Sequence, residues 1–294
     1  MEFVANLAGV VGPIFLCAAV GFGWTRLGMP FDTKITTPLI MNVGMPALII
    51  SHLSEQHVPS SELWQMITAA LVAVVLFGVV AAAFLRVCRL DLRTYLGAFM
   101  FANVGNIGLP TVSLAFGEAG LALAFGFWAV VVVGLLTVGT WLPQQQISFK
   151  KLLSSPLIYA VVIGLGLQAA DLELPKIVHA PLDILGGMAI PLMLLSLGHA
   201  IAGLQPGSLA KGFLLAAAHL VIVAGVAAAT VWLLDLEGVV RNVFIIEALM
   251  PVSVFTYLFA QQYRAEDAPA VASLILFSTA LTIIAIPLAL AYWV

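Results

Sequence analysis

The chain is a series of apolar segments, each long enough to cross a lipid bilayer, joined by short polar breaks. A transmembrane helix needs about 20 consecutive, mostly apolar residues. By this criterion the sequence predicts ten spans, with approximate ranges 3–24, 34–53, 63–86, 93–117, 120–142, 153–171, 180–200, 209–234, 239–261 and 269–292. The expected fold class is therefore an all-α polytopic membrane protein, one compact bundle without a soluble domain.

The composition excludes an ordinary soluble protein. Of the 294 residues, 63% are hydrophobic and only 9% are charged, whereas soluble domains have roughly 45–50% apolar and about 25% charged residues. The first ten residues, MEFVANLAGV, contain no basic region of the kind that precedes a cleaved signal sequence. The first apolar segment is therefore expected to remain in the protein as a span.

The placement of Lys and Arg predicts how the spans are oriented. Of the eleven basic residues, only Lys176 and Arg241 fall on one side of the predicted bundle. The other side has Arg26, Lys34, Arg86, Arg89, Arg93, Lys150, Lys151, Lys211 and Arg264. The positive-inside rule makes this second side cytoplasmic, so both termini are expected to face out.

Five spans in each half would insert the two halves with opposite orientations, and the sequence contains traces of such an inverted repeat. The segment PLIMNVGMPALIISHL resembles PLDILGGMAIPLMLLSL, and RLDLRTYLGAFMFANVGNIGLP resembles LLDLEGVVRNVFIIEALMP. Matched, interrupted helices in the two repeats indicate the binding site of a carrier. The predicted repeats are residues 1–143 and 144–294.

The fourth and ninth predicted spans contain helix-breaking residues near their middles. The run ANVGNIGLP ends in Pro110, and the run IIEALMP ends in Pro251. A proline clashes with the carbonyl group four residues back, here that of Asn106 or Glu247. Irregular backbone at membrane depth is tolerated only inside protein or beside a water-filled cavity. We favour interrupted helices at a binding site over simple proline kinks.

The candidate substrate-binding residues lie around these breaks. No Lys or Arg falls in the core of a predicted span, so an anion would be held by helix starts and by the amides of Asn103 and Asn106. The predicted substrate-binding residues are Asn42, Asn103, Gly105, Asn106, Gly108, Pro110, Pro251 and Ser253.

Glu247 and His219 are the candidate residues for coupling to protons or cations. A charge near the bilayer midplane costs ~3 kcal/mol or more, and Glu247 is the one carboxylate expected there. The alternatives are a protonated structural Glu247 and a core His219. Asn106 and Glu247 are expected to occupy matching places in the two halves. No motif for an enzyme, a metal, another cofactor or nucleic acid is present, so none of these is expected.

Several segments resemble the auxin efflux carrier family in its bacterial branch. FANVGNIGLPTVSLAFGEAGLA is similar to the family's fourth-span motif, and EALMPVSVFTYLFAQQYRAEDAPAVASLILFSTALTIIAIPLAL resembles its ninth and tenth spans. MNVGMPALIISHL and IPLMLLSLGHAIAG resemble the second and seventh spans. The resemblance covers nearly the whole chain.

This resemblance implies the fold of the bile acid–sodium symporter superfamily, a five-plus-five inverted repeat in which spans 4 and 9 cross. Spans 1, 2, 6 and 7 would form a scaffold. Spans 3–5 and 8–10 would form a transport domain that moves in an elevator-like way. The protein would lie in the cell membrane, which in bacteria is the inner membrane.

The resemblance also implies a secondary transporter of a small organic anion, such as a malonate-type dicarboxylate or an auxin-like acid. Coupling to protons is expected from Glu247 rather than from the resemblance. The chain lacks the plant members' long loop between spans 5 and 6 and their Asn-Pro-Asn run, which argues against auxin itself. The alternatives are a sodium-coupled symporter, with Gln261 and Gln262 as further ligands, a non-transporting membrane sensor and an intramembrane enzyme. Expected partners are the anion, the lipid bilayer and H⁺ or Na⁺, and a homodimer is left open.

Overall fold

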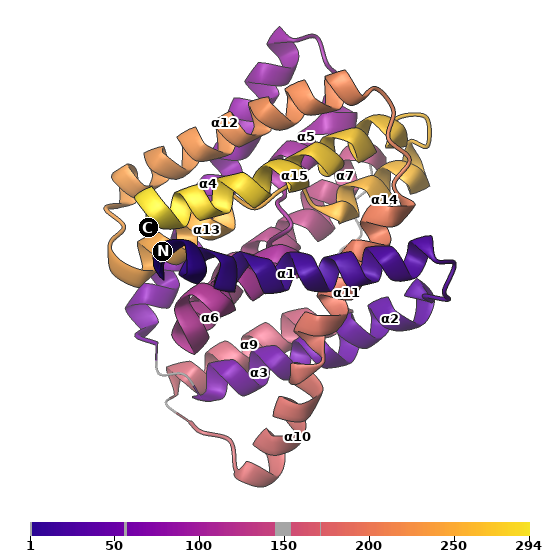
Figure 1. Cartoon of the computed structure of the whole chain (residues 1–294). Coiled ribbons are helices and arrows are strands. Elements are labelled where there is room, and N and C mark those ends of the chain that lie inside the picture. Colours follow the sequence, from indigo (N-terminus) through magenta and orange to yellow (C-terminus); the bar gives the residue numbers. More distant parts are fainter. Residues whose placement is uncertain (1, 56–57, 145–153, 171) are drawn as a thin grey trace.

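The structure, a computed structural model, describes residues 2–55, 58–144, 154–170 and 172–294. All regular elements in this part of the chain are helices (Figure 1), so the predicted all-helical fold is confirmed there. Lys150 and Lys151, which contributed to the predicted orientation, lie outside the described residues.

The elements of the first half follow the predicted spans closely, with π-helical turns (η) inside three of them. They are α1 (Glu2–Arg26), α2 (Thr33–Leu39), η1 (Ile40–Gly44), α3 (Met45–Glu55), α4 (Ser60–Val87), α5 (Leu92–Met100), η2 (Val104–Gly108), α6 (Leu109–Gly134), η3 (Leu135–Gly139) and α7 (Thr140–Gln144).

The second half has its helices in the predicted ranges too, again with interruptions. They are α9 (Pro156–Ala169), α10 (Lys176–Gly187), α11 (Ala189–Gly203), α12 (Leu209–Leu234), α13 (Gly238–Ala248), α14 (Val254–Tyr263) and α15 (Ala268–Tyr292).

Within the described residues, six helical stretches are long and apolar enough to cross a membrane. They are Thr33–Glu55, Ser60–Val87, Val104–Gln144, Lys176–Gly203, Leu209–Leu234 and Ala268–Tyr292. The third comprises two helices, because α6 changes direction at Gly117, whose φ of 64° and ψ of −157° are readily reached by glycine.

The outer surface of the bundle is apolar. Ile184 and Val221 are 76% and 73% exposed, and many other large aliphatic side chains also point outward. Such a surface would be costly in water but is matched to hydrocarbon. Together with the long apolar helices, it identifies a multi-pass membrane protein.

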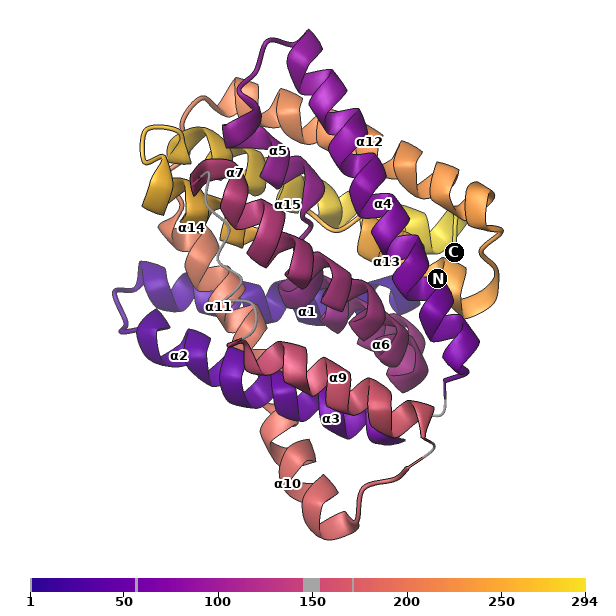
Figure 2. The same ribbon diagram turned by 180° about the vertical axis from the view of Figure 1, so that it is seen from behind.

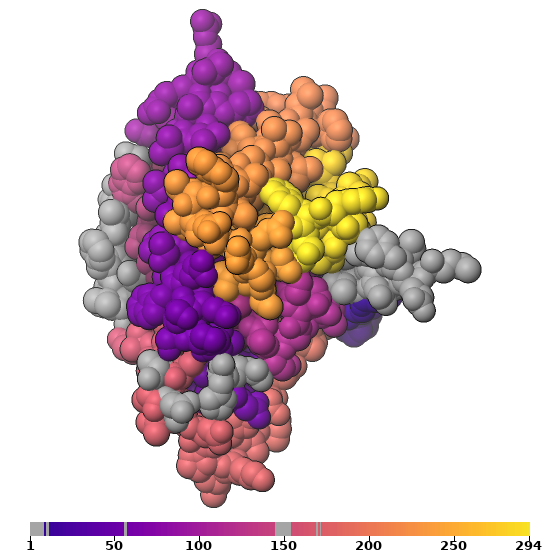
Figure 3. All heavy atoms as spheres, turned by 90° about the vertical axis from the view of Figure 1, so that its left-hand side faces the viewer, coloured from indigo at the N-terminus to yellow at the C-terminus, as the bar shows by residue number. Residues whose placement is uncertain are grey.

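The helices pack in two groups, a lower and an upper one; most of the upper group lies above the lower in Figure 1, and α6 of the upper group reaches below α1. The lower group contains α1, α2, α3, α9, α10 and α11, in which α1 packs on α11 and α3 packs on α9 and α10. The upper group contains α4–α7 and α12–α15, in which α12 packs on α15 and α4. Figure 2 shows α4 in front of the upper group. In Figure 3, α10 forms the lower end of the surface.

Glycines allow α1 and α11 to approach closely. A Cβ atom added to Gly21 would meet the backbone of Leu195, and one added to Gly198 would meet the backbone of Ala18 and Phe22. Small residues at helix contacts are the usual means of close packing in membranes. The backbones of α1 and α11 are thus in direct contact at these glycines.

One polar contact joins the two groups near the turn at Gly117. His52 Nε2 of α3 lies 2.7 Å from Glu118 Oε2 of α6. The His52 ring also meets Phe125 edge-on, with 6.2 Å between ring centroids. This contact would break if the two groups moved past one another.

Candidate functional site

Two helices are interrupted in the interior of the molecule, and the interruptions cross. One lies between α5 and η2, and the other lies between α13 and α14. The two extended segments run antiparallel and form an isolated β-bridge between Ala102 and Val252. The crossing therefore joins segments that are far apart in the sequence.

Two backbone hydrogen bonds hold the crossing. The Asn103 N–H donates to the Pro251 carbonyl at 2.6 Å, and the Ser253 N–H donates to the Phe101 carbonyl at 3.0 Å. In a membrane interior, backbone groups that leave a helix must find partners within the protein. Here each interruption supplies partners to the other.

The bridge also shows which residues correspond in the two halves. Asn103 and Ser253 each follow a bridge residue, and each is the N-cap of the next element, η2 or α14. The Ser253 hydroxyl accepts a hydrogen bond from the Phe255 N–H at 3.4 Å. Asn106 lies after its interruption and Glu247 before its own, so the bridge does not match these two residues with each other.

The two prolines also have different positions. Pro251 lies within the crossing, whereas Pro110 lies near the junction of η2 and α6, inside a helical stretch that begins at Val104. The helix is therefore interrupted at residues 101–103, before Pro110. Pairing with the second segment, rather than the proline, compensates for the lost helical hydrogen bonds there.

A cavity of about 260 Å³ lies beside the crossing; we call it the inner cavity. Its polar lining includes Asn103, Gly105, Asn106 and Ser253, and most of the rest is apolar, such as Trp128. Asn103 is buried, and its Nδ2 has no hydrogen-bond partner among the described residues. No charged side chain of the described residues lines this cavity.

The other predicted substrate-binding residues lie outside the inner cavity. Gly108 faces away toward Glu247, Pro110 is in α6, and Pro251 contributes a backbone carbonyl to the crossing. Asn42 is exposed on η1. The structure thus brings together four of the eight predicted residues.

Comparison with known proteins then identifies the family. A family model described as a membrane transport protein matches residues 144–290, half of the chain. The chain belongs to this family. The resemblance found in the sequence is confirmed at this level, and membership implies a carrier rather than an enzyme. The transporter is also similar to an uncharacterized transporter of Methanocaldococcus jannaschii, with 25% identity over 275 residues that cover 87% of this chain and 88% of the relative.

Glu247 of the transporter is buried behind the crossing. Neither of its carboxylate oxygens has a hydrogen-bond partner among the described residues. A Cβ atom added to Gly108 would overlap the carboxylate, so the group lies directly against η2. A buried carboxyl group without protein donors needs a proton, a cation or water. Glu247 does not line the inner cavity.

His219 lies on α12 and is also buried. Its ring meets Phe99 edge-on, with 5.4 Å between centroids, and its Nε2 has no partner among the described residues. It lines neither the inner cavity nor the larger cavity described below. The structure therefore places both candidate coupling residues outside the cavity walls.

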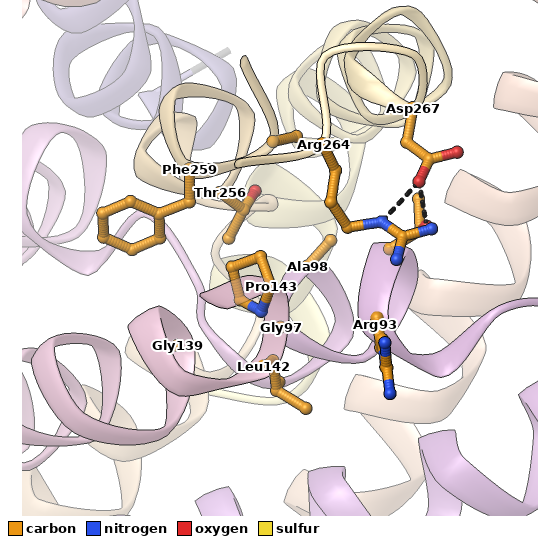
Figure 4. A pocket seen from close by; sticks show the side chains of 12 residues that line it. Arg93, Gly97, Ala98, Gly139, Leu142, Pro143, Thr256, Phe259, Arg264 and Asp267 are labelled. Atoms are coloured by element: carbon orange, nitrogen blue, oxygen red, sulfur yellow. Dashed lines mark hydrogen bonds and ion pairs between the residues drawn. The ribbon is translucent and has the colours of Figure 1, made fainter. Parts of the chain in front are cut away.

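A polar cluster ties the start of α5 to the start of α15 in the transporter (Figure 4). Arg264 contacts Asp91 at 2.7 Å and Asp267 at 2.6 Å, and Thr94 Oγ1 lies within 2.9 Å of both carboxylates. Burial acts to raise the pKa of Asp267, but hydrogen bonds from Thr94 and Arg264 and the charge of Arg264 lower it overall. The adjoining cavity holds only about 20 Å³, so we interpret this cluster as a structural clamp.

A larger, open cavity of about 550 Å³ adjoins the inner one; we call it the outer cavity. Asn106, Met41 and Phe255 line both cavities. The outer cavity also contains Lys34 and His199, which we had not predicted as site residues. In the sequence, Lys34 indicates only how the predicted spans are oriented in the membrane, and no spacing relates it to His199.

Proposed function

We propose that the protein is a secondary transporter of a small organic anion, bound in the inner cavity. The observation that carries this proposal is the lining of that cavity: two amides, a serine hydroxyl and the starts of two helical elements, set in apolar walls. Helix starts carry partial positive charge and free N–H groups. A small dicarboxylate or an aromatic acid combines the anionic and apolar parts that such a cavity suits.

The proposed topology has ten spans in two inverted repeats, residues 1–143 and 144–294, with both termini outside the cell membrane. It is supported by interruptions in the fourth and ninth predicted ranges and by the placement of Lys and Arg. We assign the lower helix group to the scaffold and the upper group to a transport domain that moves like an elevator. Their separate packing supports this division.

Proton coupling through Glu247, with His219 as a second candidate, is the proposed mode of energy input. The carboxylate of Glu247, which has no hydrogen-bond partner in the described part of the chain, supports it. No cluster of three or more His, Cys, Asp or Glu that could hold a metal occurs among the described residues. A sodium-coupled symporter is the alternative, which the experiment below separates.

Uptake into proteoliposomes tests the proposed function. Labelled malonate, succinate and indole-3-acetate would be offered with a proton gradient, a sodium gradient or neither. We expect at least one of these anions to accumulate when a proton gradient is imposed. Accumulation driven by sodium alone would favour the symporter alternative, and no uptake under any condition would reject the proposal.

Replacing Asn103 or Asn106 by Ala is expected to weaken anion binding about tenfold or more while the protein stays folded. Hydrogen bonds to charged groups are worth about 1.5–3 kcal/mol, and 1.4 kcal/mol is a factor of ten in affinity. Dissociation constants of the transported anion would be measured by calorimetry. Asn242→Ala, on α13 and outside both cavities, is the matched control. Unaltered affinity in both variants would remove these amides from the site.

Linking residues 52 and 118 across the two helix groups is expected to stop transport. His52→Cys and Glu118→Cys would be combined in a chain whose Cys17 and Cys88 are replaced by Ser, and joined by a short, reducible bifunctional thiol reagent. Uptake should fall to background and return on reduction, because the two groups must separate there. The single Glu118→Cys variant treated with the reagent is the control, and full uptake by the linked protein would reject the elevator-like motion.

A further inference from the structure

The outer cavity carries a cluster of groups suited to an anion. Lys34 of α2 and Ser196 and His199 of α11 line it, and no acidic side chain of the described residues does. The titratable and charged groups in its lining besides His199 are Lys34 and Tyr257. Tyr257 accepts a hydrogen bond from Gln261 at 2.8 Å. The lining therefore has a net positive character.

The His199 ring is fixed in one orientation by two neighbours. The Thr25 hydroxyl donates to the Gly21 carbonyl at 3.0 Å, so the 2.8 Å contact between Thr25 Oγ1 and His199 Nδ1 has the ring nitrogen as donor. Phe31 stacks on the ring, with 4.6 Å between centroids and an angle of 23°. With Nδ1 held as an N–H, Nε2 is the nitrogen left to meet a ligand.

Ser196 provides an independent indication of a ligand. It lies one turn before His199 on α11, so the two side chains share a face of the helix. Its hydroxyl oxygen is buried and has no hydrogen-bond partner among the described residues. An unmet buried hydroxyl is unfavourable, and a bound carboxylate would provide its partner.

We propose that the outer cavity is a carboxylate-binding vestibule, in which Lys34, Ser196 and the protonated ring of His199 hold the anion before it passes Asn106 into the inner cavity. This inference rests on the proposed function. Neutral His199 would present the lone pair of Nε2 to the carboxylate, whereas the imidazolium presents an N–H donor. Binding of the anion therefore takes up one proton at His199.

Calorimetry on the purified protein tests this vestibule with malonate and succinate as probes. Titrations at about pH 6 and about pH 8 span the range in which imidazole titrates, and buffers of different ionisation enthalpy report the protons taken up. We expect the unaltered protein to bind more tightly at the lower pH, with net proton uptake. His199→Gln should bind about tenfold more weakly at the lower pH and take up fewer protons on binding than the unaltered protein.

Lys34→Gln should weaken binding about threefold at low ionic strength, and the difference should fade as salt screens the exposed ammonium. The matched controls are His179→Gln and Lys176→Gln on α10, which lies outside this cavity. Thermal unfolding of each variant checks that it is folded, and the proton uptake of the unaltered protein tests the proposal without a substitution.

The outcomes separate this inference from the proposed function. If Asn103→Ala weakens binding while Lys34→Gln, His199→Gln and Ser196→Ala bind like the unaltered protein, the vestibule is rejected and the inner site stands. If binding takes up no proton, the role of His199 is rejected. If the unaltered protein neither binds nor transports any of the anions tested, both proposals fail.

Discussion

Replacing Gly198 by Ala is expected to destabilise the protein by about 3 kcal/mol or more, at the upper end of the cost of overpacking. The added methyl group would overlap the backbone of Ala18 and Phe22 on α1, and a helix backbone cannot move aside as a flexible side chain can. The gain in helix propensity from Gly to Ala, at most about 1 kcal/mol, is too small to offset this. Thermal unfolding in detergent measures the effect.

Gly23→Ala is the matched control, because nothing lies within 4 Å of a Cβ atom at this position on α1. It should leave the unfolding midpoint unchanged or slightly raised. Gly21→Ala should behave like Gly198→Ala, since its methyl group would meet the Leu195 backbone. Equal midpoints for Gly198→Ala and Gly23→Ala would show that α1 and α11 do not pack through these glycines.

Replacing Gly108 by Ala is expected to disrupt the crossing and greatly reduce transport. The new Cβ atom would occupy the space of the Glu247 carboxylate, which lies against the η2 backbone. In a Glu247→Ala background this space is empty, so adding Gly108→Ala should cost much less stability. A double-mutant cycle should give a coupling energy of about 1–3 kcal/mol, measured from unfolding midpoints.

Glu247→Gln is the control that separates shape from charge. The amide fills the same space, so Gly108→Ala should remain as disruptive in its presence as in the unaltered protein. By itself, Glu247→Gln should fold normally and lose the accumulation driven by a proton gradient, because the amide cannot bind and release a proton. The tighter anion binding at low pH that is assigned to His199 should remain. Undiminished accumulation under a proton gradient would exclude Glu247 as the coupling group.

The helical fold was predictable because each apolar range is long and few polar residues interrupt it. The amides of Asn103 and Asn106 were also predictable as cavity residues, since polar side chains at membrane depth are costly and usually face the interior of the bundle or a cavity. The structure places both in the wall of the inner cavity. The sequence also distinguished Glu247, which is buried and has no hydrogen-bond partner within the described ranges.

The place of the interruption could not be predicted in the same way. Pro110 is the strongest helix breaker nearby, yet the helix opens at residues 101–103, because Val252 and its neighbours provide partners there. That pairing joins two distant segments and leaves no periodic signal in either. The outer cavity could not be predicted for the same reason, because only the packing of α2 and α11 brings Lys34 and His199 to one cavity.

The backbone hydrogen bonds between Asn103 and Pro251 and between Ser253 and Phe101 limit how the protein can move. Sliding one interrupted helix past the other would break both bonds in the interior of the molecule, where backbone groups that leave a helix need other partners. The crossing is thus a fixed connection between the two halves of the chain. A bound anion would be carried within an intact pocket floor, and any gating must come from the walls around it.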